Sequence, residues 1–250
     1  MGLQNLRQRK LTIVKGFFSI LFAALFMVLT KVKLTHILGT NMKFSASVFF
    51  GPTIASIIGI VPGTLSIVLA HIFGLLIGFY KIKNITSYLV FLPIMMAGIY
   101  FAKMFKGDRK MTIPAIIAIL LFLAHPIGRR VWFYSAFWLV PIFVSLFKSK
   151  SDVILRFKPF KVYAYALGSA YVDHAIGSIM YLYYFNIPAH FWIEAIPLTF
   201  VERFIMAAGI TISYFGVKAA MKALKEVAVS VAVVVRERGE EVVLGERQTQ

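Results

Sequence analysis

Residues 44–80 read FSASVFFGPTIASIIGIVPGTLSIVLAHIFGLLIGFY, and this stretch contains no charged side chain. Its length exceeds the roughly 20 apolar residues that a helix needs to cross a bilayer. Pro62 and Gly63 interrupt it, which predicts either two short crossings or a pair of half-helices. In both cases the stretch adds an even number of membrane passes or none. It indicates an integral membrane protein rather than a soluble domain.

Apolar segments of similar character lie on both sides of this stretch. None of them alternates polar and apolar residues as the strands of a membrane β-barrel do. Helices satisfy their own backbone hydrogen bonds, as lipid requires. We therefore predict an all-α fold, a polytopic transmembrane bundle of six to eight helices. The further segments are Leu11–Thr30, Ser87–Ala102, Met111–Ala124, Val131–Phe147, Val162–Ile187 and Ala195–Val217.

The distribution of positive charge predicts the orientation. The N-terminus, residues 103–110, residues 148–161 and the flank of the last helix are rich in lysine and arginine, and the alternate loops are poorer. Positive loops face the cytoplasm, so both termini are predicted to be cytoplasmic. The protein is expected in the cell membrane as a multi-pass protein in contact with lipid. Trp192 is expected in the outer interfacial belt.

Composition excludes several classes of function. The chain is 60% hydrophobic and 15% charged, with a net charge of +17 and no cysteine. Its basic residues sit in short loops, so nucleic-acid binding is not expected. Without cysteine there are no disulfides and no thiol chemistry. The sequence has no phosphate-binding glycine loop with lysine, no HExxH and no GxSxG, so no cofactor, metal or enzyme activity is predicted.

The C-terminal part has a different composition from the rest. Residues 1–222 are assigned to the transmembrane bundle and residues 223–250 to a cytoplasmic tail. Valine-rich runs flank the charged turn Arg236–Glu241, a pattern that suggests a small β-hairpin. A helical extension of the last segment is the alternative.

Five His, Asp, Glu and Arg residues lie within the apolar segments and are the predicted substrate-binding residues. They are Asp173, His174, Glu202, Arg203 and His71. A charged group at bilayer depth costs a few kcal/mol, so it usually has a partner or lines a cavity. Neighbouring residues face different sides of a helix, so Glu202 and Arg203 are expected to pair elsewhere. We predict the pairs Asp173–Arg203 and Glu202–His71, which can be structural or bind a ligand.

Small residues in the central stretch predict close helix contacts. Two pairs of glycines are four residues apart, a spacing that lets helix backbones approach. Proline and glycine breaks also expose backbone groups to a ligand at depth. The predicted packing residues are Gly51, Pro52, Gly59, Gly63, Gly74 and Gly78.

With these residues in view, the sequence resembles the substrate-binding (S) subunits of energy-coupling factor (ECF) transporters. The similar parts are residues 44–47 and 50–59 with Pro62-Gly63, then residues 173–177, Ile196-Pro197 and Glu202-Arg203. The resemblance implies a six-helix bundle that captures a vitamin or similar micronutrient from outside. It also implies a transmembrane coupling subunit and a pair of cytoplasmic ATPases as partners.

The sequence departs from that family in its first helix. The family presents small residues there to the coupling subunit, often alanines four residues apart. Only Ser19 and Ala23 have this spacing here, and they are the predicted docking residues.

Three functions compete on these grounds. The first is a transporter subunit that binds a small solute in a pocket lined by Asp173, Glu202 and His71. The second is a structural or assembly subunit of a larger membrane complex. The third is an intramembrane enzyme, for which the sequence provides no required spacing of catalytic residues.

Overall fold

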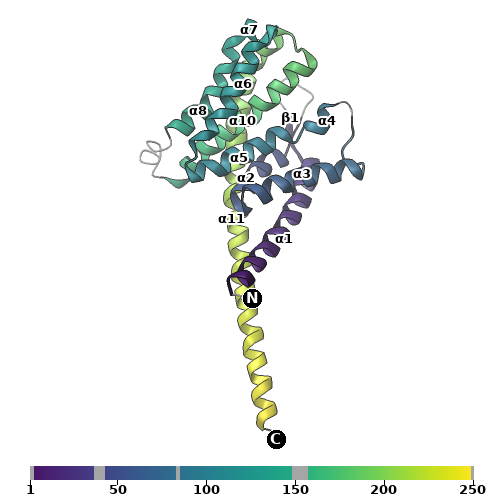
Figure 1. The fold of residues 1–250 in the computed structure, drawn as a ribbon, viewed down its shortest axis with the longest axis vertical. Coiled ribbons are helices and arrows are strands. Elements are labelled where there is room, and N and C mark those ends of the chain that lie inside the picture. Colours follow the sequence, from purple (N-terminus) through teal and green to yellow (C-terminus); the bar gives the residue numbers. More distant parts are fainter. Residues whose placement is uncertain (1–2, 37–42, 83–84, 148–156, 249–250) are drawn as a thin grey trace. The chain divides into compact units, whose positions relative to one another are not determined.

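The computed structural model describes residues 3–36, 43–82, 85–147 and 157–248 (Figure 1). It divides into two compact units, residues 1–213 and 214–250. The fold is all-α apart from one antiparallel ribbon of two short strands. The elements are α1 (Leu3–Lys31), β1 (Lys33–His36), β2 (Lys43–Ser45), α2 (Ser47–Ile58), α3 (Ile60–Leu76), α4 (Thr86–Leu89), α5 (Leu92–Lys106), η1 (Arg109–Thr112), α6 (Ile113–Ala124), α7 (Pro126–Arg130), η2 (Trp132–Trp138), α8 (Leu139–Leu146), α10 (Lys158–Phe185) and α11 (Ala189–Gln248).

The apolar stretch of residues 44–80 forms α2 and α3, and the break between them is at Gly59. Gly59 has φ +107° and ψ 158°, a backbone conformation open mainly to glycine. Pro62 then lies in the first turn of α3, where no intrahelical N–H bond is lost. The break predicted at Pro62-Gly63 is therefore wrong by about one turn, because that proline is compatible with a helix start.

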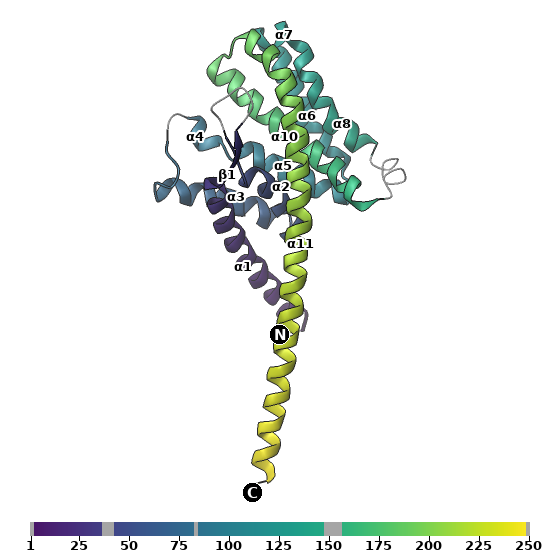
Figure 2. The same cartoon turned by 180° about the vertical axis from the view of Figure 1, so that it is seen from behind.

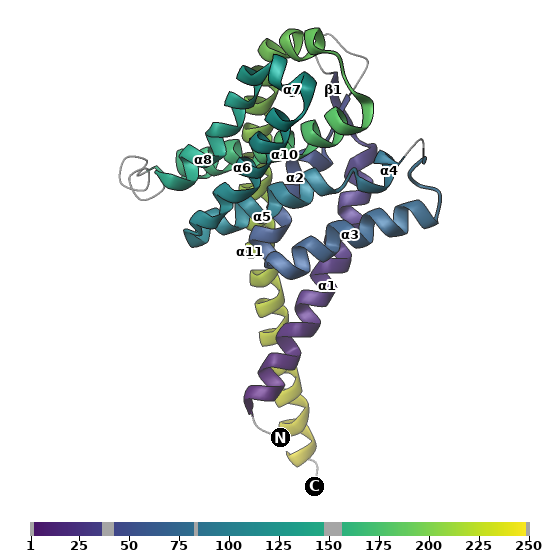
Figure 3. The ribbon, with the colours of Figure 1, turned by 45° about the horizontal axis from the view of Figure 1, so that its top comes forward.

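Helix α5 lies at the centre of the first unit, where it contacts α2, α3 and α10. Helix α1 contacts α2 and α3 (Figure 3). Several hydrogen bonds tie α5 to later helices; among them, Ser169 Oγ donates to the Ala97 carbonyl at 2.8 Å, and Tyr100 Oη donates to the Pro141 carbonyl at 2.9 Å. These bonds satisfy polar groups in an apolar interior, where an unpaired group is costly.

Some of the predicted packing residues do lie at close contacts. A Cβ on Gly63 would lie 2.5 Å from Ala55 Cα, so α2 and α3 touch backbone to backbone. A Cβ on Gly51 would lie 2.5 Å from Ile94 Cγ2 on α5. Pro52 is buried inside α2. Gly74 packs against the ring of Tyr80, in the loop that follows its own helix.

Gly59 and Gly78 have a different role from the predicted one. Gly78 has φ +69° and no atom within 4 Å of an added Cβ. Each of these two glycines follows the end of a helix and has a positive φ that other residues rarely adopt. Neither brings two helices close together by lacking a side chain. The spacing of four residues therefore indicates close packing for only part of the predicted set.

Among the described residues, three helical segments are long and apolar enough to cross a membrane. They are Thr12–Lys31 in α1, Thr86–Lys106 over α4 and α5, and Ala189–Val227 in α11. Shorter apolar helices include α2 with 12 residues and α3 with 17. At about 1.5 Å per residue these two reach about 18 and 26 Å, against a hydrocarbon core of roughly 30 Å. The chain is thus a membrane protein, and the number of crossings and the position of the termini stay predictions.

The C-terminal tail is helical. Helix α11 continues through Gln248, so the tail forms the helical extension rather than the β-hairpin. The boundary between the two units follows Ser213, earlier than the predicted one after residue 222. The lysines and the arginine of residues 148–156 used for orientation lie outside the described residues.

Candidate functional site

Four of the five predicted site residues meet between α10 and α11. Figure 2 shows α10 beside the upper part of α11. Arg203 Nη1 lies 3.2 Å from Asp173 Oδ2, and Arg203 Nη2 lies 3.4 Å from Glu202 Oε2. Arg203 Nη1 also donates to the Ala170 carbonyl at 3.5 Å. The predicted Asp173–Arg203 pair is confirmed as a contact.

Glu202 pairs with its neighbour Arg203, whereas the sequence predicts a partner on another helix for each of them. Adjacent residues leave a helix about 100° apart, but the long arginine side chain can curve back toward the glutamate. The predicted Glu202–His71 pair is therefore wrong. The side chains are largely buried, with 9% of Arg203, 17% of Asp173 and 13% of Glu202 exposed. We call these three residues the charged trio.

The charged trio has an excess of negative charge when both carboxyl groups are ionised. Two carboxylates face one guanidinium, and Glu202 Oε1 is buried without a hydrogen bond from the described residues. A buried charge without a full set of partners costs free energy. The trio therefore joins α10 to α11, and removal of Arg203, its one cation, should lower the stability of the fold.

His174 belongs to a hydrogen-bonded chain beside the charged trio. Trp138 Nε1–H donates to His174 Nδ1 at 3.2 Å, and His174 Nε2 lies 3.0 Å from Tyr134 Oη. Tyr134 Oη lies 3.0 Å from Thr199 Oγ1. Since an indole N–H can only donate, Nδ1 accepts and the ring proton is on Nε2. Both ring nitrogens of His174 thus have protein partners.

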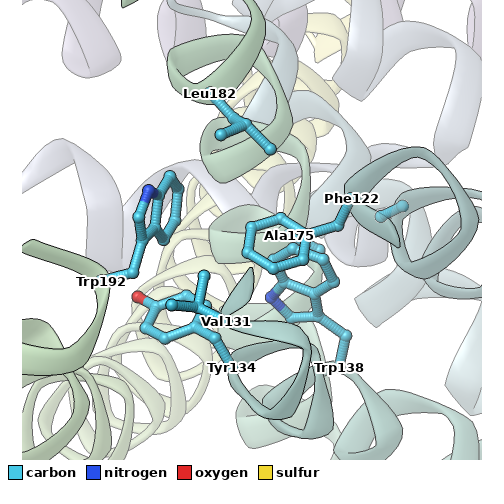
Figure 4. Close-up of a cluster of buried hydrophobic side chains, with 8 residues drawn as sticks. Phe122, Val131, Tyr134, Trp138, Ala175, Leu182 and Trp192 are labelled. Atoms are coloured by element: carbon cyan, nitrogen blue, oxygen red, sulfur yellow. The ribbon is translucent and has the colours of Figure 1, made fainter. Parts of the chain in front are cut away.

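An aromatic cluster surrounds this chain. Figure 4 shows Phe122, Tyr134, Trp138 and Trp192 gathered around Ala175 and Val131. The rings of Tyr134 and Trp192 have centroids 5.0 Å apart, and those of Phe122 and Trp138 are 5.1 Å apart. Trp192 is only 5% exposed, so it packs inside the protein, and its place at the outer interface stays a prediction. Its indole N–H donates to the Ile187 carbonyl.

An apolar groove of about 370 Å³ lies near this cluster. Tyr171 and Phe137 stack in its wall with centroids 5.8 Å apart. Neither Asp173 nor Glu202 lines it. The predicted pocket between Asp173, Glu202 and His71 is not formed by these side chains.

His71 lines a different and larger cavity of about 610 Å³. We call it the basic cavity, because Lys31, Lys33 and Lys81 all line it. Its wall is built by the end of α1, the β ribbon, α2, α3, residues 79–81, residues 86–94 and the end of α10. The other lining residues are Phe26, Thr30, Ser45, Ser47, Val48, Phe79, Tyr80, Thr86, Ser87, Val90, Phe91, Ile94, Tyr181 and Phe185.

His71 is held in the wall of the basic cavity by its surroundings. Its Nε2 lies 2.9 Å from the Ser87 carbonyl, and its ring lies between Tyr80 and Phe91 with centroids 5.4 and 5.1 Å away. The Tyr80 hydroxyl is buried near that of Thr30, but the two make no hydrogen bond of acceptable geometry. It is a polar group without a partner among the described residues.

No sequence pattern marks the three lysines as site residues, because lysines in short loops are expected in any membrane protein and indicate only its orientation. Lys31 and Lys81 are distant in sequence, and only the packing of α1 against α3 brings them together. Ser19 and Ala23 lie on α1 and are half-buried, and their docking role stays a prediction. Within the described part of the chain, no three His, Asp or Glu side chains lie close enough to hold a metal ion.

Comparison with known proteins gives one distant relative. An uncharacterized protein from Methanocaldococcus jannaschii is 28% identical over 163 residues, which cover 57% of this chain. The match spans 55%, about half, of that relative's length. No family model matches the chain, and no solved structure matches it.

Proposed function

We propose that the protein is the substrate-binding component of a micronutrient uptake transporter embedded in the cell membrane. It captures a small solute from outside and relies on a coupling subunit and separate ATPase subunits. The observation that carries this proposal is the basic cavity, whose volume of about 610 Å³ is in the range of small-molecule sites. In the predicted orientation, the loops with Lys33 and Lys81 face outside.

The resemblance to ECF substrate-binding subunits supports the same function through the residues of α2, α3, α10 and α11. The sequence has no nucleotide-binding loop of its own, which fits a subunit whose energy comes from partners. The charged trio fits as a device that holds α10 to α11. In this proposal the solute contacts the basic cavity rather than Asp173 or Glu202.

A matched pair of variants tests this function. Val48 lines the basic cavity, so Val48→Trp should fill part of it. Val61→Trp is the control, because Val61 is 69% exposed on α3 and lies outside the lining. Each protein is purified in mild detergent from native membranes, and mass spectrometry identifies the retained small molecules and proteins.

We expect wild type and Val61→Trp to retain a small molecule that Val48→Trp loses, and ATPase subunits to co-purify with all three. Equal retention by Val48→Trp would show that the basic cavity is not the binding site. Recovery of an unrelated assembly, with no ATPase and no ligand, would contradict the transporter function.

A structural or assembly subunit is the second proposal, and the C-terminal unit favours it. Helix α11 continues from Tyr214 to Gln248 as a separate unit, and Leu224 and Val227 are exposed on it. Exposed apolar side chains on such a helix suit a helical partner. Deletion of residues 223–250 should then remove co-purifying proteins while ligand retention is unchanged. Unchanged protein recovery would contradict this role for the tail.

A further inference from the structure

We infer that the basic cavity binds an organic anion with a flat, apolar body. This inference rests on the proposed function, since it names the class of solute for the same site. The first observation behind it is the charge of the residues that line the cavity. Three lysines line the cavity, and no Asp or Glu is found among its described lining residues.

The charge imbalance extends through the part of the chain that builds most of the cavity. The first acidic residue in the whole sequence is Asp108, beyond the end of α5. Of the lining residues, only Tyr181 and Phe185 come from later in the chain. No nearby carboxylate in α1–α5 therefore competes with a ligand for the lysines.

Two of the lysines are positioned without being neutralised. Lys31 Nζ donates to the Phe79 carbonyl at 2.8 Å, and Lys33 Nζ donates to the Thr30 carbonyl at 3.0 Å. An ammonium group has three N–H donors, and a carbonyl oxygen carries no net charge. Each lysine thus has donors and a full charge left for a ligand. Lysine acts as a point charge, which suits a carboxylate or a phosphate.

The apolar part of the lining predicts the rest of the ligand. Aromatic rings from α1, residues 79–80, Phe91 and α10 face the same cavity. His71 and Tyr80 stack with an interplanar angle of 23°, so this part of the wall presents flat surfaces. Flat rings favour a planar partner in an offset stack. The unpartnered Tyr80 hydroxyl offers one further hydrogen bond.

A cation is the class that this cavity disfavours. It would meet three positive charges without a carboxylate to balance them, and like charges at close range repel. A neutral ligand would leave the charges of the lysines uncompensated. Anionic, neutral and cationic ligands should therefore bind with different affinities. Three compounds that share one aromatic ring system and differ in charge can test this.

The test uses indole-3-acetate, indole-3-ethanol and tryptamine, which share one ring system and are anionic, neutral and cationic. Full-length protein in phosphatidylcholine nanodiscs is titrated with each by calorimetry. We expect the affinity of indole-3-acetate to be at least about tenfold higher than that of the other two compounds, since a charge-assisted hydrogen bond contributes about that factor. Its affinity should fall as salt is raised.

Lysine variants test whether the tighter binding of indole-3-acetate arises in the basic cavity. The double variant Lys31→Met/Lys33→Met, and Lys81→Met in another loop, should each weaken indole-3-acetate about tenfold and leave indole-3-ethanol unchanged. Lys106→Met is the matched control, because Lys106 is exposed at the opposite end of α5 and does not line the cavity. It should change nothing.

The outcomes separate the inference from the proposed function. Tryptamine binding as tightly as indole-3-acetate, with both lost in Val48→Trp, would overturn the anion class and leave the binding function intact. No binding of any of the three compounds would overturn the inference, and ligand retention from native membranes would still test the function. Strong weakening of both indole-3-acetate and indole-3-ethanol by added phosphatidylglycerol would also overturn it, because a lipid would then occupy the cavity, whereas a negative membrane surface repels only the anion.

Discussion

Arg203→Met should be the most destabilising single change in the charged trio. It removes the one cation that faces both Asp173 and Glu202, at 3.2 and 3.4 Å. At an effective dielectric constant near 20, one unit-charge contact at such a distance is about 5 kcal/mol. Desolvation offsets part of it. Loss of one partner from a buried pair typically costs about 3–5 kcal/mol, and that is the expected loss of unfolding free energy.

The charge count predicts an order among the variants. Asp173→Asn leaves a neutral pair of Arg203 and Glu202, so we expect a smaller loss of about 1–2 kcal/mol. Arg203→Met leaves two carboxylates without a cation. Adding Asp173→Asn and Glu202→Gln to Arg203→Met should therefore restore part of the stability, although each substitution removes a native group.

The assay is reversible unfolding of the full-length protein in one detergent, followed by tryptophan fluorescence. Trp138 and Trp192 are buried near the trio, so their emission should report the loss of packing there. A double-mutant cycle gives the coupling energy between Asp173 and Arg203. Additive effects, or a triple variant less stable than Arg203→Met alone, would refute the reasoning.

Two further predictions concern a glycine and a carboxylate in a loop. Gly63→Ala should cost about 1–3 kcal/mol of unfolding free energy by overpacking against Ala55. Gly16→Ala is the control and should cost nothing, because no atom lies within 4 Å of the new Cβ. Equal melting temperatures of the two variants would contradict the close contact at Gly63. The hydrogen bond from Lys103 lowers the pKa of Asp108 below 3.8, so Asp108 stabilises the fold above that value and loses this effect as pH falls through its folded pKa. The difference in melting temperature between wild type and Asp108→Asn should shrink as pH is lowered below 3.8, and a constant difference would contradict it.

The helical membrane class follows from the sequence because it depends on composition alone. The Asp173–Arg203 contact also follows, since two opposite charges in apolar helices require partners. The exact position of the break between α2 and α3 does not follow from the sequence. Pro62 looks like a breaker in sequence but fits the first turn of α3, and the conformation of Gly59 decides the boundary instead.

The binding residues are harder to predict for a physical reason. His71 finds its partner in the backbone carbonyl of Ser87, a group that every residue carries and no sequence pattern marks. Lys31 and Lys81 become neighbours through the packing of helices rather than through spacing. The absence of acidic residues before Asp108 was the available signal for a basic cavity.

The placement of the charged trio has a consequence for biosynthesis. Asp173 and Arg203 are 30 residues apart, and the carboxylate is made first. At about 5–20 residues per second, a nascent chain carries Asp173 for about two to six seconds before its cation is synthesised. In the predicted bundle α10 crosses the membrane, and placing that carboxylate alone in lipid would be unfavourable. We therefore expect the translocon to hold α10 back and release it into the bilayer together with α11, as a hairpin whose charges are already paired.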